Sequence, residues 1–159
     1  MDRSILDLPF YGVEHRQLSD AIFDWASTAM PAIDHHDTDN ACRQLVAALG
    51  KAGFLRYAVP AAYGGALDEL DSRSLCIARE TLAYHDGLAD FAFAMQGLGT
   101  GAITLSGSEE IKRHVLPKVA AGEWISAFAL TEPLAGSDVG AMACDARLEG
   151  DHYVINGEK

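Results

Sequence analysis

Basic residues are scarce in this sequence. Its 159 residues include 12 Lys and Arg against 23 Asp and Glu, which gives a formal net charge of −11. Proteins that bind nucleic acids non-specifically draw their affinity from Lys and Arg on phosphates, and no basic stripe compensates here. The composition therefore argues against a nucleic-acid-binding protein, and any polyanionic ligand would have to be recognised by local groups rather than by overall charge.

Long apolar runs and a leader segment are also absent. No stretch approaches the roughly 20 apolar residues of a bilayer-spanning helix, and residues 1–10 lack the basic start and apolar core of a signal peptide. We therefore expect no membrane span and a cytoplasmic location. Hydrophobic residues nevertheless make up 49% of the chain and charged residues 22%, a composition typical of a globular protein with a real core.

Cysteine is rare, and metal-binding patterns are missing. The three cysteines, Cys42, Cys76 and Cys144, are odd in number and have no C-x-x-C spacing. We expect reduced, buried thiols rather than a disulfide framework or a zinc site. Residues 34–39 contain two His and three Asp, but neighbouring side chains on a polar loop point apart. We interpret this segment as a solvated linker and predict no metal site.

Hydrophobic periodicity predicts a helical bundle over most of the chain. Helices are expected over about residues 14–29, 40–52, 72–85, 89–105 and 109–121. The fourth is apolar on most sides, which is typical of a helix in the middle of a bundle. Within it, residues 97–102 read GLGTGA, which is not the G-x-G-x-x-G fingerprint and lies in no βαβ unit. A nicotinamide site is therefore disfavoured, and the small residues indicate close helix packing or room for an apolar chain.

From Glu123 the pattern changes to strands, expected over about residues 124–130, 141–148 and 152–155. Tyr153 and Ile155 alternate with polar neighbours, as in a half-buried strand. Asn156-Gly157 is a strong signal for a type I′ hairpin, yet no returning strand follows it. We therefore expect a mostly α fold: a helical bundle-like domain over residues 1–122, then the first strands of a β-barrel domain over residues 123–159, truncated at the C-terminus.

The clearest functional signal lies in residues 128–138, FALTEPLAGSD. Pro133 ends the predicted strand because it has no N–H, and Ala135-Gly136-Ser137 would let a ligand approach the backbone closely. Free amides and hydroxyls at a strand end suit a flat polar ring edge or a phosphate. The same composition is also typical of an ordinary glycine-containing connection, and these residues alone do not decide between the two.

Two motifs in this region, TEP-x-AGSD at residues 131–138 and GD-x-Y-x-ING-x-K at residues 150–159, resemble the acyl-CoA dehydrogenase family. Similar segments occur upstream in the same order: VP-x-x-YGG at residues 59–65, and GSEE at residues 107–110 leading to LPK. The resemblance covers nearly the whole chain. Two residues depart from it, because Phe128 stands where many members have Tyr, and Leu134 where Gly, Asn or Asp is common.

The resemblance implies FAD as the cofactor. It places Phe128, Leu130, Thr131, Gly136 and Ser137 along the flavin, with Ser137 also able to contact an acyl-CoA. Phe91, Met95 and Leu98 would form part of the wall around the acyl chain, although an aliphatic stripe at helical spacing is by itself more often plain core.

Family members oxidise an acyl-CoA thioester to trans-2-enoyl-CoA: a carboxylate removes the α-proton as the β-hydride passes to flavin. The resemblance further implies a role in fatty acid metabolism, a flavoprotein electron acceptor and a homo-oligomer. The region with the catalytic Glu is not in this chain, so we assign no catalytic residue and expect the isolated chain to be inactive. The alternative is a short non-catalytic paralogue that serves as a binding or assembly partner of a full-length dehydrogenase.

Overall fold

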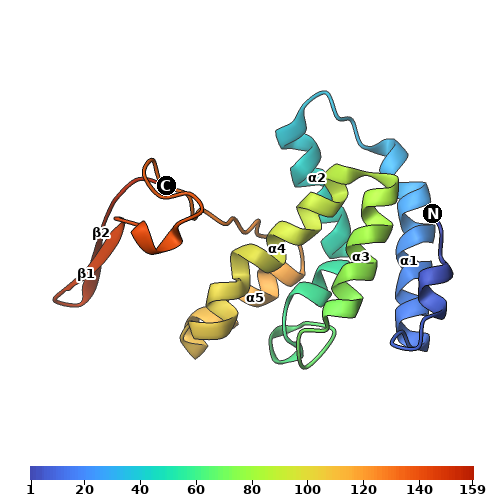
Figure 1. Ribbon diagram of the computed structural model, residues 1–159, viewed down its shortest axis with the longest axis horizontal. Coiled ribbons are helices and arrows are strands. Elements are labelled where there is room, and N and C mark those ends of the chain that lie inside the picture. Colours follow the sequence, from blue (N-terminus) through green and yellow to red (C-terminus); the bar gives the residue numbers. More distant parts are fainter. The chain divides into compact units, whose positions relative to one another are not determined.

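The computed structural model describes residues 1–159. These residues form two compact units, 1–127 and 128–159, each of which is described by itself. Figure 1 shows helices in the first unit and a pair of strands in the second. The predicted fold class, a mostly helical chain that ends in the first strands of a β-domain, is confirmed. The domain boundary expected between Gly122 and Glu123 stays a prediction.

The first unit contains all five helices that the periodicity predicted. They are α1 (Val13–Ala29), α2 (Thr38–Lys51), α3 (Ser72–His85), α4 (Gly87–Ser106) and α5 (Glu109–Ala120). Helix α1 packs on α3, α3 packs on α4, and α2 and α5 also contact α4. None of these helices combines the length and the apolarity that a membrane crossing requires. Helix α4 is thus contacted by α2, α3 and α5, whereas α1 packs mainly on α3.

Side-chain caps define where four of these helices begin. In each case an oxygen of the N-cap residue accepts a hydrogen bond from a first-turn amide, at Asp37, Asp71, Asp86 and Ser108. Asp37 belongs to the acidic His-containing segment, so part of that segment serves to start α2. Across the chain, no group of three His, Cys, Asp or Glu side chains is arranged to hold a metal ion.

The main core lies between α1, α2, α3 and α4. Its largest fully buried side chains include Ile22, Leu45, Leu49, Leu82 and Phe93. The expectation that α4 is buried on most sides is wrong for this unit, because Phe91, Leu98 and Leu105 are 57%, 54% and 84% exposed. The expectation of buried thiols is wrong for Cys76, which is exposed, and all three cysteines are free.

The second unit is built around an antiparallel pair of strands, β1 (Asp145–Glu149) and β2 (His152–Asn156). Glu149 pairs with His152, so the turn contains only Gly150 and Asp151. Gly150 has φ 67°, as the first central residue of a type II′ turn requires. The turn between the two strands expected over residues 141–148 and 152–155 therefore contains only two residues.

Three details of the β-patterned region were predicted wrongly. Residues 125–130 form no strand, and Ile125 and Phe128 are 55% and 52% exposed. A strand needs a neighbour's backbone groups, whereas the Ser126 amide donates to the side chain of Gln96 at 2.9 Å. Tyr153 and Ile155 are 67% and 70% exposed, because a two-stranded ribbon has no second layer to cover them. Asn156 lacks the positive φ of a type I′ turn.

Candidate functional site

A cavity of about 560 Å³ lies against α4 in the first unit. This volume falls within the range of roughly 300–1,000 Å³ that is common for ligand pockets. The walls come from residues 57–70, from α3 and from α4, and most of the lining is apolar: Val59, Pro60, Leu67, Leu75, Phe93, Leu98 and Leu105. The cavity therefore suits an apolar ligand or an apolar part of a larger one.

The loop wall of this cavity is held in place by the protein itself. The guanidinium of Arg56 donates to the carbonyl oxygens of Gly64 at 3.0 Å and Gly65 at 3.1 Å. The Ala61 amide donates to the Leu67 carbonyl at 2.8 Å. Gly65 has to be glycine, since a Cβ there would lie 1.7 Å from the Val59 carbonyl oxygen. The cavity is thus preformed and does not depend on a ligand for its shape.

The glycine-rich run of α4 has two distinct structural roles. Gly97 and Gly101 line the cavity, and a Cβ at Gly101 would meet nothing within 4 Å. Gly99 lies elsewhere on the helix, where a Cβ would come 2.7 Å from the hydroxyl of Ser126 and from the Ala127 amide. Both interpretations of the sequence therefore apply: Gly99 permits close packing of the chain, whereas Gly97 and Gly101 leave room in the cavity.

Charged residues occur in only part of the cavity lining. They are Asp68 and Glu69 from the loop and Arg79 from α3. The guanidinium of Arg79 makes a two-pronged ion pair with Asp90 of α4, with Nε–Oδ1 at 2.8 Å and Nη2–Oδ2 at 3.0 Å. Asp68 and Glu69 are exposed and make no ion pair. The cavity therefore combines an apolar interior with uncompensated negative charge.

The three residues predicted to line an acyl-chain wall are placed differently from one another. Leu98 lines the cavity, whereas Phe91 and Met95 do not. Phe91 is exposed on the surface of α4, and the Met95 carbonyl accepts a hydrogen bond from the Ser126 hydroxyl at 3.0 Å. The structure thus does not bring the three together around this cavity, and the roles of Phe91 and Met95 stay predictions.

In the second unit, the loop of residues 131–138 is fixed by Glu132. Its backbone exchanges hydrogen bonds with Ala135, which closes a turn over Pro133 and Leu134. Its carboxylate is only 8% exposed and accepts from the amides of Ala143 and Cys144 at 2.6 and 3.1 Å, and it pairs with Lys159 at 2.9 Å. The Ala143 amide and the Lys159 ammonium lower the pKa of Glu132 below its ordinary value.

Neither Glu132 nor Lys159 was predicted to have a role. The signal that could have found them is that both stand in the two motifs, Glu132 in TEP-x-AGSD and Lys159 in ING-x-K. A residue of a motif can stabilise the conformation of its loop and need not contact a ligand itself. Glu132 is thus a positioning residue for the loop.

Three of the residues predicted to contact a cofactor, Thr131, Gly136 and Ser137, lie on this loop, and the other two directly precede it. Phe128, Thr131, Gly136 and Ser137 are exposed, and Leu130 is partly buried, with its carbonyl accepting from Lys159 at 3.0 Å. The hydroxyls of Thr131 and Ser137 have no hydrogen-bond partner within the protein. A Cβ at Gly136 would meet nothing within 4 Å, and its φ is not positive. Nothing inside the unit therefore requires glycine at this position, so the loop fits a flat group that approaches its backbone.

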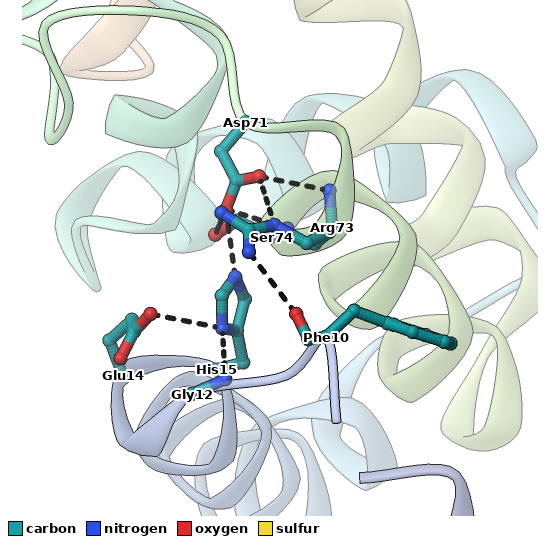
Figure 2. Close-up of polar contacts among 7 residues, drawn as sticks. All are labelled: Phe10, Gly12, Glu14, His15, Asp71, Arg73 and Ser74. Carbon is teal, nitrogen blue, oxygen red and sulfur yellow. Dashed lines mark hydrogen bonds and ion pairs between the residues drawn. The ribbon is translucent and has the colours of Figure 1, made fainter. Parts of the chain in front are cut away.

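A buried histidine forms a separate polar cluster in the first unit (Figure 2). The Nδ1 atom of His15 accepts from the Gly12 amide at 2.9 Å, so Nε2 carries the proton and donates to Asp71 at 2.8 Å. Asp71 also accepts from Arg73 and Ser74. Because both ring nitrogens are engaged and the side chain is fully buried, His15 is a structural residue. No motif or spacing in the sequence singles it out.

The chain is similar to known proteins over most of its length. Residues 13–123 match the family model described as "Acyl-CoA dehydrogenase, N-terminal domain". The probable acyl-CoA dehydrogenase FadE25 of Mycobacterium tuberculosis is 40% identical over 73% of this chain and 29% of its own length. The glutaryl-CoA dehydrogenase of Desulfococcus multivorans is 33% identical over 82% of this chain and 34% of its own.

A solved structure, that of an acyl-CoA dehydrogenase from Bacillus anthracis complexed with FAD, has a TM-score of 0.77 and is 34% identical. The match covers 93% of this chain and 26% of that one. The chain thus spans about a third of the length of the curated relatives that it matches. Because the family model covers most of the helical unit and the similar structure covers both units, this chain belongs to the acyl-CoA dehydrogenase family.

Proposed function

We propose that this chain is part of an FAD-dependent oxidoreductase that converts an acyl-CoA thioester to trans-2-enoyl-CoA. The observation that carries the proposal is the loop of residues 131–138, which Glu132 holds in place while its free hydroxyls and Gly136 remain exposed. A loop whose conformation is held by internal hydrogen bonds, and whose polar groups are exposed, can bind a ligand without rearranging. The similar structure that contains FAD supports the same cofactor here.

Each loop residue has a distinct role in this proposal. Thr131 and Ser137 offer hydroxyls to the polar edge of the flavin, and Gly136 allows the backbone to approach it. Phe128 and Leu130 supply apolar contacts with the ring, and Ser137 also contacts the acyl-CoA. When bound, FAD supplies the redox chemistry by accepting the β-hydride of the acyl chain.

The helical unit would provide the acyl-chain wall, from the α4 residues Phe91, Met95 and Leu98. No residue of this chain is assigned as the base that removes the α-proton, and the chain alone is proposed to be inactive. A flavoprotein electron acceptor, a homo-oligomeric assembly, a cytoplasmic location and a role in fatty acid metabolism belong to the same proposal. So does the division into a helical domain of residues 1–122 and a β-domain that begins at residue 123.

The test uses the native protein purified from its source cells. We expect a yellow protein with bound FAD whose flavin absorbance bleaches when an acyl-CoA is added under anaerobic conditions. An intact mass well above 17.0 kDa would mean that the native protein has further residues, which can include the catalytic base. A mass of 17.0 kDa would favour the non-catalytic binding or assembly partner. A colourless protein with no flavin response to any acyl-CoA would contradict the proposal.

A pair of matched variants tests the loop itself. Gly136→Val adds a branched side chain to open space, where the proposal places the flavin. Gly140→Val adds the same side chain nearby, where the nearest atom to a Cβ is the Asp138 carboxylate at 3.3 Å, the end of a flexible side chain. We expect Gly136→Val to lose FAD and Gly140→Val to retain it. Equal FAD content in the two variants would argue against a flavin at this loop.

A further inference from the structure

The charges around the α4 cavity set a limit on the ligand that it can hold. We infer that this cavity admits an acyl chain with an apolar end and rejects one that ends in a carboxylate. This inference rests on the proposed function, because it concerns the acyl chain of an acyl-CoA substrate. It goes further by naming the substrate class and the residues that select it: Asp68, Glu69 and the Arg79–Asp90 pair.

The first reason is that the cavity has no free cation. Arg79 is the only basic residue in its lining, and Nε and Nη2 of its guanidinium donate to the two oxygens of Asp90. A two-pronged pair of this kind uses the same fork that would bind a ligand carboxylate. A terminal carboxylate in the cavity would therefore lose its water without gaining an ionic partner, which is costly in an apolar surrounding.

The second reason is repulsion from Asp68 and Glu69. Both carboxylates line the cavity and neither makes an ion pair. Like charges within a Debye length, about 8 Å at physiological ionic strength, repel one another, most strongly where the surroundings are apolar. An uncharged chain end avoids this repulsion and gains from the apolar walls of Leu67, Leu75 and Leu98.

The third reason is that the α4 wall leaves open space in the cavity. Gly97 and Gly101 add no side chain to the α4 wall of the cavity, and nothing lies within 4 Å of a Cβ at Gly101. The loop wall opposite is fixed by Arg56. A preformed apolar cavity of about 560 Å³ can therefore accept a chain without rearrangement.

Two ligands of equal length separate the charge effect from all other contacts. Octanoyl-CoA and 7-carboxyheptanoyl-CoA share the CoA moiety and differ only at the chain end. Their dissociation constants for the 159-residue chain are measured by isothermal titration calorimetry, and the site is located by NMR shifts of the Gly97 and Gly101 amides. We expect octanoyl-CoA to bind about tenfold more tightly or better, since a carboxylate without an ionic partner is disfavoured in an apolar cavity.

Variants identify the residues responsible for the preference. Asp68→Asn/Glu69→Gln removes the repulsion, and Asp90→Asn releases the Arg79 guanidinium. Each is expected to reduce the ratio of the two dissociation constants severalfold, mainly by improving the binding of 7-carboxyheptanoyl-CoA. An unchanged ratio in both variants would overturn the inference.

A matched glycine pair shows whether the chain enters this cavity. Gly101→Leu fills the cavity, whereas Gly87→Leu places the same side chain at the start of α4, outside the cavity. Neither meets an atom within 4 Å at its Cβ, so both variants are expected to fold, as circular dichroism checks. Gly101→Leu should lose octanoyl-CoA binding and Gly87→Leu should keep it. Equal binding in both variants, or no octanoyl-CoA binding to the unmodified chain, would overturn the inference.

Failure of this inference can be told apart from failure of the proposed function. Native protein whose flavin is bleached equally well by both ligands would retain the proposed function and overturn the inference. Native protein without flavin would contradict the proposed function, whereas a clear preference for octanoyl-CoA in calorimetry, lost in Gly101→Leu, would still support the inferred selectivity of the cavity.

Discussion

The Nε2 atom of His15 lies 2.8 Å from Oδ2 of Asp71, although 56 residues separate the two in the sequence (Figure 2). His15 stands in the first turn of α1, and Asp71 is the N-cap of α3. The second oxygen of Asp71 accepts from Arg73, which also donates to the Phe10 carbonyl at 3.1 Å. One carboxylate therefore caps α3 and ties it to the start of α1.

We predict that Asp71→Asn lowers the free energy of unfolding by about 2 kcal/mol, because it weakens hydrogen bonds to a charged, largely buried group. Asp37→Asn is the matched control, since Asp37 caps α2 through the Asn40 amide alone and Asn is an equally good N-cap. It should cost only a few tenths of a kcal/mol. Urea denaturation at pH 7 measures both, and equal effects would mean that the bond to His15 contributes nothing.

The same carboxylate predicts how stability depends on pH. Burial alone would raise the pKa of Asp71, but hydrogen bonds from Arg73, Ser74 and His15 outweigh it and hold the pKa below the ordinary value of 3.8. The ionised form is thus favoured in the folded state. Its stabilising contribution is complete above the unfolded pKa and is lost as the pH falls through the folded pKa.

The difference in unfolding free energy between the unmodified chain and Asp71→Asn should therefore be constant from pH 7 down to about pH 5 and shrink below about pH 4. Urea titrations at several pH values measure it. A difference that already shrinks between pH 7 and pH 5 would contradict the assignment of this stability to the Asp71 carboxylate.

The hydrogen bonds of Glu132 predict a local effect on the candidate cofactor loop. Glu132→Gln replaces one acceptor oxygen by an N–H donor group, which faces either amides or the Lys159 ammonium. Hydrogen exchange at the Ala143 and Cys144 amides should therefore become faster, while exchange within α1 stays unchanged. Glu158→Gln is the control, because Glu158 is exposed and makes no ion pair. Unchanged exchange at both amides would show that Glu132 does not hold the loop.

The sequence predicted the helices well and the β-patterned end less well. Helices α1 and α2 carry their own apolar stripes and end signals, such as Leu18 and Ile22 in α1 and Gly53 with φ 83° after α2. Strand positions depend on partners that local patterns do not specify. Residues 124–130 have strand composition, yet Ser126 finds its hydrogen-bond partner in Gln96 of α4.

The candidate site shows the same division between local and long-range information. The loop of residues 131–138 was selected by the resemblance of its motif to a known family, because its composition alone is equally typical of an ordinary glycine-containing connection. The cavity beside α4 was not predictable in detail, since its charge pattern depends on Arg79 meeting Asp90 from a neighbouring helix. Likewise, the pairing of Glu132 with Lys159 joins the two ends of the second unit.

The two structural roles of the α4 glycines give the last prediction. Alanine is favoured over glycine in a helix by up to about 1 kcal/mol, so Gly97→Ala, whose Cβ would meet only the Cβ of Ala58 at 3.7 Å, should raise the free energy of unfolding. Gly99→Ala should lower it despite the same gain in helix propensity, because its Cβ would come 2.7 Å from the Ser126 hydroxyl and the Ala127 amide. Thermal denaturation of the two variants measures the contrast.

The close approach at Gly99 allows the amide and hydroxyl of Ser126 to donate to the Gln96 side chain on α4. Gly99→Ala should therefore also speed hydrogen exchange at the Ser126 amide, while Gly97→Ala leaves it unchanged. Two variants of equal stability would show that this segment yields to the added methyl group and is not held against the helix.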